Sequence, residues 1–187
     1  VPPKEQVINS FQRLSGLVGK KRMSWRYDPI FITDKYSTDY HIEQFGYMAK
    51  ELSGYTDQCV VSFIDLYEKT KRNFSGVRNV TDHEQEQLIT AFSEIAKDND
   101  LQIHLCCENK DLVRENVDAD GCLSKNVLEE SLGCKLDVPN KKMARSECSC
   151  LLGADIGAYN TCGHGCLYCY ANYDRETVLR NMKMHIF

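Results

Sequence analysis

The stretch TCGHGCLYCYAN places three cysteines close together, at Cys162, Cys166 and Cys169. Each iron of a cubane 4Fe–4S cluster normally takes one thiolate, so three thiolates would leave the fourth iron open to a small molecule. Gly163 and Gly165 let the backbone turn tightly, and nearby N–H groups can donate to the sulfides of a cluster. The spacing C-x3-C-x2-C therefore predicts a 4Fe–4S site on these three cysteines.

Another set of cysteines is suited to a closed site with four thiolates. Cys106, or its neighbour Cys107, ends a predicted strand, Cys122 lies in a turn, and Cys148 and Cys150 form a C-x-C pair. Four thiolates hold either a structural zinc ion or an iron–sulfur cluster. The alternative for the cysteine that ends the strand is a small buried hydrophobic side chain. We expect this set to be a second metal site, either a second 4Fe–4S cluster or zinc.

The chain contains ten cysteines, five of which fall between Cys148 and Cys169. Such clustering, without a secretion signal at the N-terminus, favours metal binding over disulfides. Zinc remains an alternative for the C-terminal cysteines, because Cys166 and Cys169 could pair with the C-x-C cysteines and leave Cys162 unused.

Alternating helices and strands must position these thiols. Apolar spacing and apolar runs predict helices over 3–19, 37–55 and 81–100, and strands over 22–32, 59–67 and 101–108. Ser37 or Thr38 is the expected N-cap of the second helix, and Thr81 with Glu84 forms a capping-box pattern at the start of the third. Three successive helix–strand units are typical of parallel α/β proteins. Three units are too few to close an eight-stranded barrel, so either the sheet is open or the remaining strands lie before Val1. We favour the second explanation and predict an α/β fold of partial TIM-barrel-like parallel β/α repeats, followed by a cysteine-rich, loop-rich C-terminal region.

The pattern changes near residue 109, where short, turn-rich segments replace the repeats. We therefore predict a β/α repeat region over 1–108 and a metal-binding region over 109–187 that packs on it. Helices are expected within the second region over 125–132 and 173–185.

Charged side chains toward the carboxyl ends of the predicted strands are candidate catalytic or substrate-binding groups. They are Arg26, Asp28, Asp65 and Glu108. In parallel α/β folds the carboxyl ends of the strands face the functional crevice, so we expect these side chains on one rim. A structural ion pair is the alternative for Arg26 and Asp28.

The cysteine spacing followed by an aromatic residue resembles the signature of radical S-adenosylmethionine enzymes, and CLYCY is similar to the cluster loop of spore photoproduct lyase and its relatives. The resemblance implies that S-adenosylmethionine binds the open iron and is cleaved by one electron to a 5′-deoxyadenosyl radical. It also implies that Tyr168 lies near the adenine.

Most of the chain resembles a prokaryotic domain-of-unknown-function family, whose C-terminal cysteines are similar to the radical S-adenosylmethionine cluster site. The matching stretches are WRYDPIF (25–31), SFIDLYEKTKRN (62–73), GCL (121–123), SECSC (146–150) and IGAYNTCGHGCLYCYANY (156–173). The resemblance implies an iron–sulfur protein without naming its reaction.

These observations favour a cytoplasmic iron–sulfur enzyme that acts on a small molecule and receives electrons from a donor protein. The alternatives are a non-catalytic module stabilised by zinc or a cluster, and an iron–sulfur electron carrier or redox sensor. The net charge of −4 does not indicate a nucleic-acid partner and does not exclude one. No apolar run approaches the length of a membrane span, so we expect no membrane partner.

Overall fold

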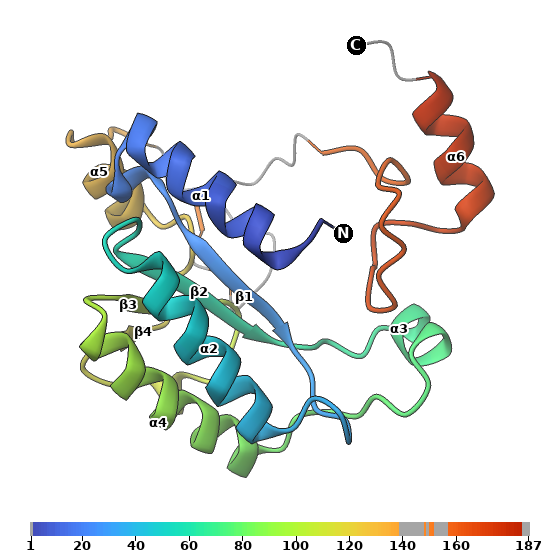
Figure 1. Cartoon of the computed structure of the whole chain (residues 1–187), viewed down its shortest axis with the longest axis horizontal. Helices are drawn as coiled ribbons and strands as arrows, with labels where there is room; N and C mark the ends of the chain where they lie inside the picture. The colour runs from blue at the N-terminus through green and yellow to red at the C-terminus, as the bar shows by residue number, and fades with distance from the viewer. Residues whose placement is uncertain (1, 139–147, 149, 152–156, 185–187) are drawn as a thin grey trace.

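Four parallel strands in the order β1-β2-β3-β4 form the sheet at the centre of the protein (Figure 1). The structure is a computed structural model, and it describes residues 2–138, 148, 150–151 and 157–184. The strands are β1 (Trp25–Ile30), β2 (Gln58–Phe63), β3 (Gln102–Leu105) and β4 (Val117–Asp118). The helices are α1 (Lys4–Val18), α2 (Thr38–Leu52), α3 (Glu68–Asn73), α4 (Asp82–Asp98), α5 (Lys125–Leu132) and α6 (Arg175–Met184), with short 3₁₀ turns at Lys20–Arg22 and Lys110–Leu112.

The α/β class and the parallel pairing predicted from the sequence are confirmed, but the partial TIM barrel is not. In the described part of the chain the sheet is open, with β1 and β4 at its two edges. The barrel prediction depended on the alternation of helices and strands, which open parallel sheets share with barrels. Within the same residues, no helix is both long and apolar enough to cross a membrane.

Two elements differ from the expectations. The basic segment after β2 contains the short helix α3, whose Glu68 lies in the first turn and whose Lys71 and Arg72 lie in the last turn, where each charge complements the helix dipole. Strand β4 lies in the predicted region 109–187 and pairs with β3. The division at residue 108 stays a prediction, and residues 139–147, 149, 152–156 and 185–187 of that region lie outside the described residues.

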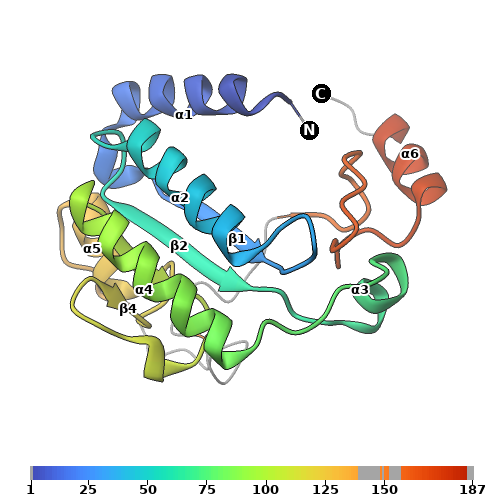
Figure 2. The ribbon, with the colours of Figure 1, turned by 60° about the horizontal axis from the view of Figure 1, so that its bottom comes forward.

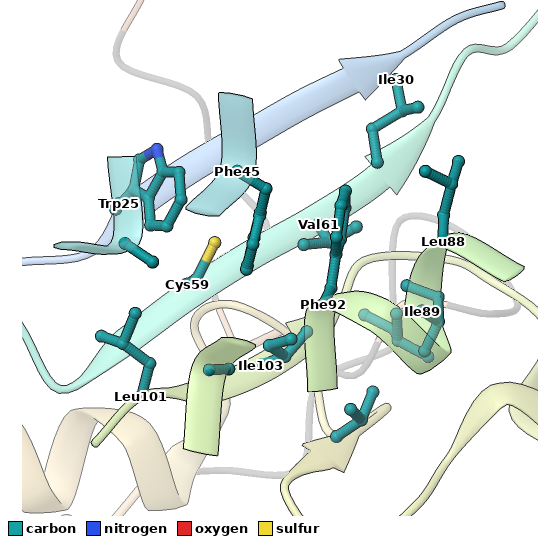
Figure 3. Packing of buried hydrophobic residues seen from close by; sticks show 14 of the residues in the cluster. Trp25, Ile30, Phe45, Cys59, Val61, Leu88, Ile89, Phe92, Leu101 and Ile103 are labelled. Carbon is teal, nitrogen blue, oxygen red and sulfur yellow. The ribbon is translucent and has the colours of Figure 1, made fainter. Parts of the chain in front are cut away.

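One face of the sheet is apolar and packs against α2 and α4 (Figure 2). Trp25 of β1 and Val61 of β2 belong to this core, because side chains on the same face recur at every second residue of a strand. Phe45 of α2 and Phe92 of α4 stack with ring centroids 3.9 Å apart and planes 7° apart (Figure 3). Both rings are fully buried, and burial of such a side chain contributes about 2–3 kcal/mol.

The opposite face of the sheet carries mainly polar side chains. Arg26 and Asp28 alternate with the core residues of β1, and Ser62 does the same on β2. On β3, the His104 Nδ1 atom lies 2.9 Å from the Asp118 Oδ1 atom of β4. The packing of α2 and α4 on one face thus directs polar groups to the other.

The starts of α2 and α4 confirm the predicted capping. Ser37 accepts a hydrogen bond from the Tyr40 N–H, and Thr81 and Glu84 form a capping box. Glu84 also receives a hydrogen bond from Arg78, which is the main reason why its pKa falls to about 2. These local contacts determine where the two covering helices begin.

His41 of α2 connects that helix to β1 and to the segment after it. The Nε2–H of His41 donates to the Phe31 carbonyl oxygen at 2.9 Å, so Nδ1 accepts from the Tyr27 hydroxyl, also at 2.9 Å. Burial lowers the pKa of His41 below its ordinary value of 6.5, although the bond to Phe31 opposes this shift. The structure thus stabilises the neutral imidazole.

We expect acid to destabilise the protein through His41. The unfolded chain binds a proton at pH values where the folded chain does not, so this stability is present above the ordinary pKa of 6.5 and decreases as the pH falls below it. In His41→Gln, the loss of unfolding free energy between about pH 7.5 and about pH 5.5 should be smaller than in the wild type. Urea unfolding at both pH values measures this. The exposed His83→Gln is the control, and equal pH dependence in the wild type and His41→Gln would contradict the assignment.

Candidate functional site

The cysteine loop, residues 160–173, is closed by hydrogen bonds to Asn160 at its start. The Asn160 N–H donates to the Ala171 carbonyl oxygen at 3.0 Å, and the Asn160 side-chain oxygen accepts from the Tyr173 N–H. The Asn181 side chain of α6 donates to the Asn160 carbonyl oxygen at 3.2 Å. Asn160 is 8 % exposed, so these bonds join both ends of the loop and α6 in a largely buried position.

Cys162, Cys166 and Cys169 all line one pocket, the loop pocket, which has a volume of about 710 Å³. Cys162 is exposed, and the other two thiols are half-buried. The Cys169 N–H donates to the Cys166 carbonyl oxygen at 3.1 Å, and the Asn172 side chain donates to the Cys162 carbonyl oxygen at 2.7 Å. The structure therefore brings the three predicted cluster ligands to the wall of a single pocket.

The two glycines of the loop also line the loop pocket. Gly165 has a φ of +67°, a conformation that side chains other than glycine and asparagine rarely adopt. A Cβ atom on Gly163 would approach the Met182 sulfur to 3.4 Å. Gly165 thus favours glycine because of its backbone conformation, whereas Gly163 has room for a Cβ atom, and their predicted role beside a cofactor stays a prediction.

The donor set of the loop fits a 4Fe–4S cluster in type and in number. Three thiols on one short loop, with no fourth cysteine in it, are the ligands that such a cluster needs when one iron stays open. Among the described residues, however, no three Cys, His, Asp or Glu side chains are already arranged to hold a metal ion. The thiols would therefore have to move before they could hold a cluster.

A second pocket, the strand-end pocket, lies at the carboxyl ends of β1, β2 and β3 and has a volume of about 520 Å³. It brings together all four candidate catalytic residues, which are Arg26, Asp28, Asp65 and Glu108. The expected rim is thus a shared pocket wall in the structure, while the catalytic role of these groups stays a prediction.

Arg26 lies at the centre of the polar contacts in the strand-end pocket. Its Nη2 atom is 2.8 Å from the Asp28 Oδ2 atom, and the Ser62 hydroxyl donates to the other oxygen of Asp28. Burial alone would lower the pKa of Arg26, but hydrogen bonds to Asp28 and to Cys122 outweigh it and hold that pKa above its ordinary value. The guanidinium therefore stays charged and joins a carboxylate to a thiol.

Glu108 is the acid whose proton affinity the pocket alters most clearly. Its Oε1 atom accepts a hydrogen bond of 2.7 Å from the Phe63 N–H. Burial raises the pKa of Glu108 to about 7 against the effect of this bond, and the nearby Asp65 and Asp28 raise it further. A carboxyl group with such a pKa can hold or release a proton near neutral pH, as acids and bases in active sites do.

Tyr168 connects the two pockets. It lies between Cys166 and Cys169 in the chain, yet it lines the strand-end pocket. Its ring centroid is 6.1 Å from that of Phe31, and burial raises the pKa of its hydroxyl to about 12. The chain between Cys166 and Cys169 therefore contributes side chains to both pockets.

The four cysteines of the predicted second metal site also line the strand-end pocket. These strand-end thiols are Cys106, Cys122, Cys148 and Cys150. The Sγ atoms of Cys122 and Cys150 are 3.5 Å apart. A hydrogen bond from Cys106 lowers the pKa of Cys122 to about 5, with burial opposing and Arg26 assisting.

The remaining thiols lie elsewhere, apart from Cys107, which lines the same pocket. Cys59 is fully buried in the core, and Cys134 is exposed.

Sequence reasoning missed Ser62 and Asn160. Ser62 could have been found from the alternation of the predicted strand, because it lies two residues after Val60, the partner of Arg26, and so shares the face that carries Arg26 and Asp28. No local signal indicates Asn160, because its partners lie at the far end of the loop and on α6.

The fold and the site define an α/β protein with a thiol-rich loop beside the carboxyl ends of a parallel sheet. The chain belongs to the family described as "Domain of unknown function (DUF1848)", whose profile matches residues 1–171. The matched range includes all ten cysteines. Comparisons with curated proteins and with solved structures found no match.

We expect Asn160 to hold the cysteine loop closed. Asn160→Gly keeps the backbone free to adopt the observed φ of 60° but removes the oxygen that accepts from Tyr173. Loss of a buried acceptor costs about 1–3 kcal/mol, so amide hydrogen exchange in residues 157–173 should become about tenfold faster or more. Asn160→Asp keeps the acceptor and should exchange like the wild type. Wild-type exchange in Asn160→Gly would contradict this role.

Proposed function

We propose that this protein is an iron–sulfur enzyme of the radical S-adenosylmethionine type, which acts on a small polar molecule in the strand-end pocket. Cys162, Cys166 and Cys169 would hold a 4Fe–4S cluster, with one iron left open for S-adenosylmethionine. When bound, the reduced cluster supplies the electron that cleaves S-adenosylmethionine.

The observation that carries this proposal is the position of Tyr168. The residue belongs to the loop of the three cysteines, but it lines the pocket that contains the polar strand-end groups. A cofactor held at the loop would therefore adjoin a substrate in the neighbouring pocket. Proximity of this kind is required for a reaction in which a reactive group passes directly from cofactor to substrate.

The charges of the strand-end pocket suit a polar substrate. The Arg26 guanidinium can pair with a carboxylate or phosphate, although Asp28 already occupies part of its donors. Asp65 and Glu108 can accept from hydroxyl or amino groups, and Glu108 can exchange a proton near neutral pH. Tyr168 offers an aromatic face for a planar ring.

We expect each of the three cysteine-to-alanine variants, Cys162→Ala, Cys166→Ala and Cys169→Ala, to abolish cleavage of S-adenosylmethionine. Removal of one thiolate leaves the cluster with too few protein ligands to stay bound. Protein reconstituted without oxygen should contain about four irons and four sulfides. The measurements are the iron and sulfide content of each variant and the amount of 5′-deoxyadenosine that it forms when dithionite supplies electrons.

Cys134→Ala is the matched control, because this thiol is exposed and lines neither the loop pocket nor the strand-end pocket. It should retain full iron content and cleavage. Equal cleavage in all variants would refute the assignment. A cluster that is reduced and reoxidised reversibly but leaves S-adenosylmethionine intact would instead indicate an electron carrier or redox sensor. Stoichiometric zinc without sulfide after reconstitution would indicate a metal-stabilised module.

A further inference from the structure

The strand-end thiols come from three separate parts of the chain and meet at one pocket wall. Cys106 directly follows β3, and Cys122 follows β4, whereas Cys148 and Cys150 belong to a later segment. All four side chains are half-buried. Four half-buried thiols at one wall form a soft donor set, separate from the one on the cysteine loop.

These thiols lie near one another. The Cys122 and Cys150 sulfurs are 3.5 Å apart. Cys106 affects the pKa of Cys122, and Cys148 affects that of Cys150, so each of these pairs is close enough for one thiol to alter the proton affinity of the other. One pair is therefore in direct contact, and the other two thiols each lie close to a member of it.

Backbone hydrogen bonds hold these thiols in place. The Leu151 N–H donates to the Leu123 carbonyl oxygen at 2.9 Å, so the residues after Cys122 and Cys150 lie side by side. The Leu123 N–H donates to the Cys150 sulfur at 3.4 Å. N–H donors of this kind are the usual outer contacts of metal-bound thiolates.

The sulfur spacing suits a single tetrahedral ion. Metal–sulfur bonds of about 2.3 Å around a tetrahedral zinc ion place neighbouring sulfurs about 3.8 Å apart, close to the 3.5 Å between Cys122 and Cys150. A disulfide would join two of the four sulfurs and leave the other two without a role. The Arg26 guanidinium, hydrogen-bonded to Cys122, offsets part of the negative charge that four thiolates would bring.

We propose that the strand-end thiols bind one zinc ion, which fastens the segments around Cys122 and Cys150 to the end of β3. Binding releases the thiol protons to the buffer and requires no oxidant or reductant. Since no three described donors are already in a metal-binding arrangement, at least two of the four thiols change their rotamers as the ion enters. This site goes beyond the proposed enzymatic function and does not depend on it.

The test uses the full chain, reduced and metal-free, with zinc as the only added ligand. We expect one zinc ion per chain, at least about 100-fold weaker binding in Cys122→Ser, and unchanged binding in Cys166→Ser and Cys134→Ser. Competition with a coloured zinc chelator measures the affinity. Wild-type affinity in Cys122→Ser, or a loss of zinc in Cys166→Ser alone, would overturn the proposal.

Alkylation of cysteines in the wild-type chain tests the site without depending on whether any variant folds. With zinc present, mass spectrometry should show slower alkylation of all four strand-end thiols and unchanged alkylation of Cys134. Protection of the cysteine-loop thiols instead would overturn the site. Iron and sulfide retained on the strand-end thiols of a Cys162/Cys166/Cys169 triple alanine variant would show a second cluster in place of zinc. Failure to cleave S-adenosylmethionine, by contrast, bears only on the proposed function.

Discussion

The alternation of side chains along three parallel strands is the constraint on which the rest of the structure depends. One set of alternate residues packs under α2 and α4, where the Phe45 and Phe92 rings stack 3.9 Å apart. The other set, which includes Arg26 and Asp28, must then lie on the opposite face. A shift of one residue in β1 would turn these charges toward the core and expose Trp25. The core and the polar pocket wall are therefore determined by the same register.

The parallel direction of the strands explains why the candidate site is where it is. Their carboxyl ends meet at one edge, so residues of β1 and residues at or just after the ends of β2 and β3 share the strand-end pocket although they are far apart in sequence. The later segments return to this edge, and Tyr168 brings the cysteine loop to the same pocket. Two groups of thiols thus lie beside one set of polar side chains.

Arg26 connects the two kinds of chemistry in the strand-end pocket. Its guanidinium is hydrogen-bonded to the Asp28 carboxylate and also to the Cys122 thiol. The positive charge of Arg26 helps to lower the pKa of Cys122, and burial makes such a contact stronger than it would be in water. The local balance differs for Glu108, where burial dominates and raises the pKa to about 7.

Local sequence patterns determined much of this protein. Apolar periodicity predicted α1, α2 and α4, the pair Thr81 and Glu84 predicted the start of α4, and the cysteine spacing predicted a shared loop site, because each depends on residues a few positions apart. Tertiary structure alone decided that the described sheet is open, that Asn160 closes the cysteine loop, and that Cys122 lies 3.5 Å from Cys150. These features depend on how distant segments pack together, and a residue's type and its sequence neighbours carry little information about that.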